Sequence, residues 1–456
     1  MSAPKFKNAI VNGSGTKVIL TYSETLSSTT ANTSAFAVTV GGNTVSITSA
    51  EVNGSTIELT LGSQVDHATP VKVSYTDPSG SDDINAIQDS AGNDAASLSN
   101  RGVRNLRGFS TFTELNRIQT FRPSQESFTR YAFAALKDDG SVITWGFNSS
   151  GGNSSSVSSS LSSGVSQIYC GGLAFAALKD DGSVVTWGDS SLGGDSSAVS
   201  SSLNSGVSQI FSNYGSFAAL KDDGSVITWG YNYNGGNSSS VSNALSSGVS
   251  KIYSTRGAFV ALKDDGSVVT WGNPSQGGDS STVSSSLSSG VNKICTNSQA
   301  FAALKNDGSV ITWGESSHGG DSSAVSSSLS SGVSQIYSTG SAFAALKDDG
   351  SVVTWSGHGG NSSDVSSSLS SGVSQIYSNE KAFAALKDDG SVVTWGYHES
   401  GGDSSAVSSS LSSGVSQIYN TKNAFAALKN DGSVITWGKS SHGGDSSAVS
   451  SSLSSG

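Results

Sequence analysis

The sequence has little cysteine, methionine, proline or charge. Its 456 residues include two Cys, one Met and five Pro, and charged residues make up 13% of the chain. Cys170 and Cys295 stand at different positions of a repeated pattern, so no disulfide framework is expected. No apolar run is long enough to cross a bilayer, which argues against membrane insertion. The net charge of -11 and the lack of a basic patch argue against a nucleic-acid partner.

Motifs of catalysis are also missing. The chain has no GxSxG nucleophile elbow, no GxxxxGKS or GxxxxGKT phosphate loop, no HExxH and no CxxC. Serine is abundant, but its hydroxyl becomes a nucleophile only beside a positioned base, and the serine-rich stretches hold none. We therefore expect a protein that is not an enzyme.

What the chain does contain is a repeat. The stretch from Phe175 to Gly188 reads FAALKDDGSVVTWG and recurs eight times almost unchanged. Its tryptophan column holds every Trp of the chain, spaced 42 residues apart except for one 40-residue step from the sixth to the seventh. A fixed period of this length predicts a repeat architecture. The eight tryptophans, by which we number the repeats, are Trp145, Trp187, Trp229, Trp271, Trp313, Trp355, Trp395 and Trp437.

Each repeat predicts three strands and a short helix or coil. The middle strand is apolar at successive positions, which predicts burial on both faces. The KDDG sequence after it predicts a hairpin turn with Gly in the left-handed position. In the second repeat, Asp195 is expected to cap a short helix or coil that packs through Val199 and Leu203. The strands expected there are Val165–Tyr169, Ala174–Lys179 and Ser183–Trp187.

The SGVxQI, FAALKDDG and VxTWG segments resemble the short-repeat branch of the regulator-of-chromosome-condensation family, whose bacterial members include a propeller-type β-lactamase inhibitor protein. The resemblance covers residues 115–456 and implies a β-propeller built from repeats of about 42 residues. Propellers of that family usually have seven blades, whereas this chain holds eight copies, so a seven- to eight-bladed propeller is expected over residues 131–456. No stretch matches a loop specific to nucleotide exchange, so that activity is not implied.

Residues 1–105 predict an immunoglobulin-like β-sandwich, which makes the whole chain all-β. Short runs alternate apolar and polar residues and are separated by Asn-Gly and Gly-Gly turns. Residues 106–130 are expected to form a linker that contains the first propeller strand, Leu115–Gln119. The strands expected in the sandwich are Phe6–Val11, Lys17–Tyr22, Phe36–Val40, Thr44–Val52, Thr56–Leu61, Val71–Tyr75 and Leu98–Val103.

The segments VILTYSETL, VTVGG, VKVSYTDP and NAIQDSAGNDAASL resemble the bacterial immunoglobulin-like repeat of giant surface adhesins and of the cyanobacterial swimming-motility surface protein. This resemblance, over residues 6–103, implies export, a cell-surface setting and a spacer or adhesion role. A loop in it carries Asp77, Asp82, Asp83 and Asp89. These carboxylates could bind calcium, because calcium takes six to eight oxygens, and no other cofactor is expected. Asx turns explain the same residues.

Strand direction predicts where a binding site would lie. The loop between the first and middle strands (the first loop) and the loop after Trp-Gly (the second loop) should emerge at the same end of each repeat. Among the copies these loops vary freely while the KDDG turn scarcely varies, and loops carry recognition. Neutral drift of exposed loops gives the same pattern. The candidate ligand-binding residues, chosen because Tyr and Arg dominate interface energies, are Tyr214, Tyr231, Tyr233, Arg256, Glu380, Lys381 and Tyr397.

These patterns favour a non-enzymatic adhesion or binding module, secreted or on a bacterial cell surface, whose partner is a protein or a glycan. The chain has no signal peptide of its own and stops where earlier copies continue, so we expect it to be part of a larger exoprotein. The alternatives are a soluble protein-binding or enzyme-inhibitor propeller and a sugar-binding lectin.

Overall fold

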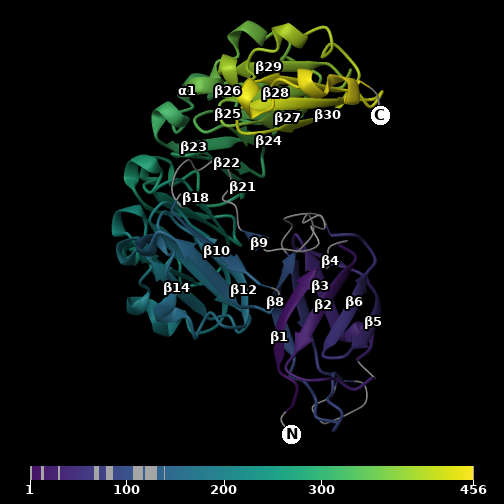
Figure 1. Cartoon of the computed structure of the whole chain (residues 1–456), viewed down its shortest axis with the longest axis vertical. Coiled ribbons are helices and arrows are strands. Elements are labelled where there is room, and N and C mark those ends of the chain that lie inside the picture. Colours follow the sequence, from purple (N-terminus) through teal and green to yellow (C-terminus); the bar gives the residue numbers. More distant parts are fainter. Residues whose placement is uncertain are drawn as a thin grey trace.

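The computed structural model describes residues 3–11, 15–28, 31–65, 71–78, 86–105, 117–118, 131–137 and 139–454. Its regular structure is all-β, apart from short 3₁₀ turns and one helical turn. Strands β1 to β8 form one sheet, and the strands after them form a series of small separate sheets (Figure 1).

The N-terminal sheet has eight strands in the order β4-β3-β7-β8-β1-β2-β6-β5. Its neighbouring strands are antiparallel except for β1 and β8, which pair in parallel. The expected strand Thr44–Val52 is divided at Ser46 into two short strands, β4 and β5. The elements are β1 Phe6–Val11, β2 Lys17–Tyr22, η1 Thr33–Ala35, β3 Phe36–Val40, β4 Asn43–Val45, β5 Ile47–Asn53, β6 Thr56–Leu61, β7 Val71–Tyr75 and β8 Leu98–Asn105.

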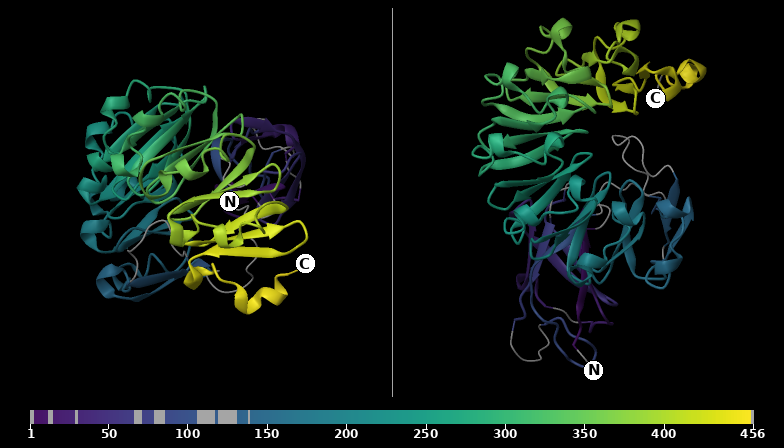
Figure 2. Two further views of the ribbon diagram at one scale, coloured as in Figure 1. Left: turned by 90° about the horizontal axis from the view of Figure 1, so that it is seen from above. Right: turned by 90° about the vertical axis from the view of Figure 1, so that its left-hand side faces the viewer.

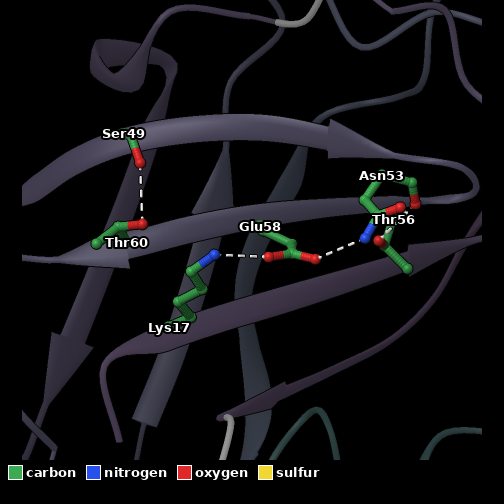
Figure 3. Close-up of polar contacts among 6 residues, drawn as sticks. All are labelled: Lys17, Ser49, Asn53, Thr56, Glu58 and Thr60. Atoms are coloured by element: carbon green, nitrogen blue, oxygen red, sulfur yellow. Dashed lines mark hydrogen bonds and ion pairs between the residues drawn. The ribbon is translucent and has the colours of Figure 1, made fainter.

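Apolar and polar residues alternate along these strands, and the apolar side chains of the whole sheet pack into one core. Val18 and Leu20 of β2 and Val38 and Val73 of β3 and β7 are fully buried in the same cluster, so both halves of the sheet contribute to it. The alternate residues make polar contacts on the other side (Figure 3). Lys17 Nζ lies 2.8 Å from Glu58 Oε2. This contact raises the pKa of the lysine and lowers that of the glutamate.

The rest of the described chain contains eight three-stranded antiparallel sheets, one for each tryptophan. The middle strand pairs with the first and third strands of its own repeat in every sheet. The expected first propeller strand is present as β9, which pairs with β10. The strands of repeats one to four are β9 Arg117–Ile118, β10 Ala132–Leu136, β11 Val142–Gly146; β12 Val165–Cys170, β13 Ala174–Lys179, β14 Val184–Gly188; β15 Val207–Ser212, β16 Ser216–Lys221, β17 Val226–Gly230; β18 Val249–Ser254, β19 Ala258–Lys263 and β20 Val268–Gly272.

Repeats five to eight follow the same plan. Their strands are β21 Val291–Thr296, β22 Ala300–Lys305, β23 Val310–Gly314; β24 Val333–Ser338, β25 Phe343–Lys347, β26 Val352–Trp355; β27 Val373–Ser378, β28 Ala382–Lys387, β29 Val392–Gly396; β30 Val415–Asn420, β31 Ala424–Lys429 and β32 Val434–Gly438. After the third strand comes a 3₁₀ turn, replaced in the sixth repeat by the helical turn α1 (Gly357–Gly360). These turns are η2 Asn148–Ser150, η4 Ser190–Leu192, η6 Asn232–Asn234, η8 Pro274–Gln276, η10 Ser316–His318, η13 His398–Ser400 and η15 Ser440–His442.

Local hydrogen bonds explain the KDDG turns and the serine-rich tails. In the second repeat Asp181 Oδ1 accepts bonds from the backbone N and the hydroxyl of Ser183, and Gly182 has φ +76°. In the tail, Asp195 Oδ1 accepts from Ser197 N at 2.8 Å, and Leu203 is buried. The expected short helix or coil is thus a 3₁₀ turn, and its N-cap is Ser196 rather than the predicted Asp195, which stands one residue earlier. Such turns are η3 Ser155–Val157, η5 Ser197–Ser202, η7 Ser239–Val241, η9 Ser281–Val283, η11 Ser323–Val325, η12 Ser363–Val365, η14 Ser405–Val407 and η16 Ser447–Ser452.

Successive repeats share their hydrophobic cores. The middle strand of each internal repeat is buried on both faces, as its sequence predicts. Between the fourth and fifth repeats, Ala258 and Val260 on one face meet Phe301 and Trp313 on the next. Seven clusters of this kind join the eight repeats. Because alanine is small, the sheets can approach closely enough for the aromatic rings to fill the space between them.

The repeats follow a curved path that stays open, with the first and last repeats apart at its two ends (Figures 1 and 2). First strands touch the first strands of the next repeat, as β15 touches β18 and β18 touches β21. Third strands instead touch the 3₁₀ turns of the previous repeat, as β20 touches η6 and η7. The first strands therefore lie along the inside of the curve and the 3₁₀ turns along its outer rim. The closed ring that the sequence resemblance implies is not formed.

Candidate functional site: the loop end of the repeats

The first and second loops of each repeat lie at the same end, as strand direction predicts. In the second repeat the backbone N of Asp189 in the second loop donates to Leu173 O in the first loop, at 2.9 Å. We call this end the loop end and the opposite end, formed by the KDDG turns, the turn end. The N-terminal sheet contacts the turn end, because Arg101 Nη1 of β8 lies 3.3 Å from Asp222 Oδ2 in the third repeat.

The first loops, which were predicted to vary freely among the copies, have one position that is nearly constant. The second residue of the loop is Asn or Thr in repeats three to eight, and in five of these six repeats, all but the sixth, its side chain donates a hydrogen bond to the second loop. Asn213 Nδ2 donates to Asn234 O at 2.6 Å, and Thr255 Oγ1 donates to Gln276 O at 2.9 Å. The alternation of Asn and Thr at this position is the sequence signal that could have revealed it. These residues are Asn213, Thr255, Asn297, Thr339, Asn379 and Thr421.

The next residue of each first loop belongs to a ladder of backbone hydrogen bonds that runs from repeat to repeat. Gly172 N donates to Tyr214 O at 2.7 Å, and Tyr214 N donates to Arg256 O at 3.1 Å. The same bond joins every successive pair, with N to O distances of 2.7 to 3.3 Å. The backbone at this position is therefore fixed, while the side chain differs in almost every repeat. These ladder residues are Gly172, Tyr214, Arg256, Ser298, Gly340, Glu380 and Lys422.

The structure divides the seven candidate residues into two groups at the loop end. The first group lies in repeats three and four and consists of Tyr214 and Arg256 on the ladder, with Tyr231 and Tyr233 in the second loop of the third repeat. Tyr231 and Tyr233 are exposed, and the two ladder side chains are half-buried. The second group lies in the seventh repeat. Ser298 and Gly340, with their small side chains, occupy the ladder between the groups.

The second group, Glu380, Lys381 and Tyr397, carries paired charges. Lys422 Nζ lies 3.5 Å from Glu380 Oε2, and Lys381 Nζ lies 5.5 Å from the centroid of the Tyr397 ring. A lysine over an aromatic face is attracted by the ring quadrupole. Lys422 was not among the candidates, although it stands at the same repeat position as Glu380.

Burial shifts two titratable groups near these surfaces. Burial lowers the pKa of His318 in the second loop of the fifth repeat; the charge of Glu315 opposes this shift, and that of Arg256 adds to it. Its Nε2 lies 3.0 Å from Gln299 Nε2. At the turn end, burial raises the pKa of Asp222, and the charge of Arg101 opposes that shift.

Two of the four proposed calcium ligands can be placed, because Asp82 and Asp83 lie outside the described residues. Asp89 Oδ1 accepts bonds from Ala91 N and Asn93 N, and its Oδ2 accepts from Asn93 Nδ2 at 2.7 Å. These bonds from Asn93 lower the pKa of Asp89. Asp77 donates its backbone N to Ser97 Oγ. Among the residues that the structure places, no three His, Cys, Asp or Glu side chains gather as a metal site. Calcium binding stays a prediction.

The fold and the loop end define a class: an all-β repeat protein of three-stranded antiparallel sheets with varied side chains on a fixed backbone ladder. In sequence, residues 1–80 match the model of the flagellar system-associated repeat family, which agrees with the surface-protein resemblance. A comparison with curated proteins gives no match. In the described part of the chain, no helix is long and apolar enough to span a bilayer.

Among solved structures, the chain is similar to Prp20p of Saccharomyces cerevisiae, the yeast RCC1 protein, with a TM-score of 0.30 and 15% identity over 51% of this chain and 72% of that one. It is also similar to human WBSCR16, with a TM-score of 0.29 and 17% identity over 69% and 76% of the two chains. The chain is also similar to the computationally designed protein Ika8, with a TM-score of 0.27 and 14% identity over 68% of this chain and 94% of that one. Scores this low do not establish a shared arrangement of the repeats.

Proposed function

We propose that the chain is a non-enzymatic binding module of a bacterial cell surface or secreted protein. In this proposal an immunoglobulin-like spacer precedes an array of eight propeller-type blades, and the loop end of the array binds a protein or a glycan. The match of residues 1–80 to a flagellar system-associated repeat supports a surface setting. The contact of the N-terminal sheet with the turn end supports the loop end as the side left for a partner.

The observation that carries this proposal is the ladder. Its backbone is held by the same hydrogen bond from one repeat to the next, yet its side chains are Gly, Tyr, Arg, Ser, Gly, Glu and Lys in turn. Because these bonds involve backbone atoms alone, the position can carry a different side chain in each repeat, unlike the core positions that packing keeps as Phe and Trp. A fixed frame with varied side chains is how repeat proteins present a recognition surface. Ladder side chains start from a preorganised backbone, which lowers the entropic cost of binding.

The test compares the two ends of the repeats. We would probe a glycan array, and intact bacterial cells by flow cytometry, with the labelled chain. A loop-end variant combines Tyr214→Ala with Arg256→Ala, and a turn-end control combines Asp264→Asn with Asp348→Asn at exposed turn positions. Loss of a Tyr or Arg anchor is expected to weaken binding about tenfold or more. Retained binding by the loop-end variant, with loss in the turn-end control, would reject the choice of end.

A lectin is the second candidate, and exposed aromatic rings favour it. Tyr231 and Tyr233 stand on one second loop beside the ladder, where they could stack on sugar rings. Seven members of the tryptophan column are buried and offer no such platform, and only Trp145 of the first repeat is exposed. Glycan-array binding that is lost in a Tyr231→Ala, Tyr233→Ala variant would support the lectin, and binding to cells without any array signal would favour a protein partner.

A further inference from the structure

The second loop of the sixth repeat is two residues shorter than that of every other repeat. Three residues separate Trp355 from the glycine pair Gly359-Gly360, whereas five separate Trp313 from Gly319 in the fifth repeat. The shorter loop forms the helical turn α1 in place of a 3₁₀ turn (Figure 1). The 40-residue step in the tryptophan column therefore marks a change in local structure.

The contact between two successive repeats, which we call a seam, normally contains a hydrogen bond to this loop. In six of the seven seams the tryptophan Nε1 of the later repeat donates to the backbone O of the first glycine of the pair, at 3.0 to 3.1 Å. At the seam between the sixth and seventh repeats, Trp395 is 3% exposed, and its Nε1 has no acceptor in the described part of the chain. A buried N–H without a partner is costly, because its hydration is lost and not replaced.

A second hydrogen bond is missing beside the same loop. In repeats three, four, five, seven and eight, the Asn or Thr of the first loop donates to the backbone O of the residue before the glycine pair. In the sixth repeat, Thr339 is 4% exposed and accepts from Ala342 N, but within residues 139–454 it makes no such bond. The shortened loop therefore brings neither carbonyl to the two buried donors, Thr339 Oγ1 and Trp395 Nε1.

The shortened loop is held against the repeat that precedes it. Ser356 Oγ donates to Ser316 O in the second loop of the fifth repeat, at 3.1 Å. A side chain on Gly357 would meet the backbone O of Ser317 in that same loop and of Ser341. The loop thus bonds backward to the fifth repeat, whereas the other internal second loops accept the tryptophan of the repeat that follows them.

The inner part of this seam is intact. Gly340 N donates to Glu380 O at 2.7 Å, so the ladder continues across it. Phe383 and Trp395 lie in one hydrophobic cluster with Ala344 of the sixth repeat, as their counterparts do at the other seams. Bonds are therefore kept at the ladder and lost in the second loop, toward the outer rim. A seam that is fixed on one side and weakened on the other can pivot.

We propose that the seam between the sixth and seventh repeats is the hinge of the array. The seam opens toward the outer rim and pivots at the ladder, so the repeats before it and the repeats after it move as two bodies. Opening lets water reach the indole N–H of Trp395 and the hydroxyl of Thr339, which restores hydration that the closed seam denies them. The motion changes the distance between the two groups of candidate residues at the loop end, a consequence that rests on the proposed function.

Hydroxyl-radical footprinting of the full-length chain, read by mass spectrometry, measures how often each tryptophan meets solvent. Trp271, Trp313 and Trp395 are equally buried, so a difference between their rates reports opening of the seams. Trp395 should be modified about tenfold faster than the other two, because its seam lacks a hydrogen bond that theirs contain. Equal rates for the three tryptophans would overturn the proposal.

A loop graft tests whether the short loop is the cause. In the restored variant, the GESS of residues 314–317 replaces Ser356 and Gly357, so the sixth loop reads WGESSHGG as the fifth does. The modification rate of Trp395 should then fall to that of Trp271. In the shortened variant, Ser-Gly replaces residues 314–317, and Trp355 of the following seam should become the fast tryptophan. An unchanged Trp395 rate in the restored variant would overturn the assignment of the hinge to this loop.

Distances between spin labels, carried on unnatural amino acids, test the motion itself. One pair, at Tyr233 and Lys439, spans the hinge, and the control pair, at Asn148 and Ser317, lies on one side of it; all four positions are exposed. The distance distribution across the hinge should be broader than that of the control pair and should narrow in the restored variant. Equal widths, or a width that the restored loop leaves unchanged, would overturn the hinge. No ligand takes part, so failure of the proposed function leaves this test intact.

Discussion

The first and fourth repeats contain nearly the same residues, yet the fourth repeat is packed into a core on both of its faces and the first only on the face toward the second repeat. Phe259 and Trp271 stack with centroids 5.4 Å apart, and Phe133 and Trp145 stack at 5.2 Å. Trp271 is 3% exposed and Trp145 is 45% exposed. The geometry within a repeat is therefore set by its own sequence, whereas burial is supplied by its neighbour. This is the behaviour of quasi-one-dimensional repeat proteins, whose stability comes from interfaces between units.

The largest expected effect separates these two tryptophans. Trp271→Ala should lower the free energy of unfolding by about 3 to 5 kcal/mol, because it empties a packed interface and removes the bond to Gly235 O. Trp145→Ala should change it by about 0.5 kcal/mol or less in the monomer, as for other exposed positions. Urea denaturation at low protein concentration measures both. Equal losses would mean that the first repeat is covered in solution.

The second comparison is between fixed and variable positions of the loops. Asn297→Ala should cost about 1 to 3 kcal/mol, because it leaves the buried groups around it without partners. Asn297 Nδ2 donates to His318 O, and its Oδ1 accepts from the backbone N of Gln299 and Ala300. Tyr231→Ala, in an exposed second loop, should cost about 0.5 kcal/mol or less. A neutral Asn297→Ala in thermal melts would contradict the structural role given to this position.

The sixth repeat differs from the others by a shorter second loop. Ser356 stands where most repeats have a glycine, and it has φ +68°. The helical turn that follows also leaves the buried Nε1 of Trp395 without a partner. Ser356→Gly should therefore stabilise the protein by about 1 kcal/mol, because glycine adopts positive φ without strain. Ser356→Ala is the control and should give no gain. A thermal melt in which both variants behave alike would rule out backbone strain.

Acid is expected to weaken the turn end before the hydrophobic interfaces. Bonds from the Ser267 side chain and backbone hold the pKa of Asp265 below its ordinary value of 3.8, and the same holds in other KDDG turns. A carboxylate with a lowered pKa stabilises the fold above its unfolded pKa, and this contribution is lost as the pH falls through the folded value. The melting temperature should thus be flat above about pH 5 and fall below about pH 4.

Asp265→Asn offers the smallest change in this series. It should lower the melting temperature slightly at neutral pH. Below pH 4 the melting temperature should fall slightly less steeply than in the wild type, because one turn carboxylate no longer contributes to the fall. Asp264→Asn, at the neighbouring exposed position whose side chain is not part of the Ser267 bonds, is the matched control. An acid profile that is the same in the wild type and in Asp265→Asn would remove the turn carboxylates as its cause.

Much of the fold could be predicted because its causes are local. The 42-residue spacing of tryptophan, the apolar middle strand and KDDG predict a sheet, its burial and its turn, and the structure confirms all three for the internal repeats. The common end of the two loops followed from strand direction alone. The ladder did not, because its partners are 40 or 42 residues apart and the bonds involve backbone atoms that carry no sequence signal. Lys422 was not predicted as a candidate, because its place beside Glu380 depends on this ladder.

The amino-acid sequence by itself determined the repeat, its three strands and the chemistry of both sheet faces, since these depend on residues close together in the chain. Only the tertiary structure decided that the curve stays open, which residues stand on the ladder, and that Phe133 and Trp145 are exposed while their counterparts are buried. The physical reason is that a residue's burial depends on which neighbour its repeat meets, and the first repeat has the same sequence pattern as the others without a preceding one.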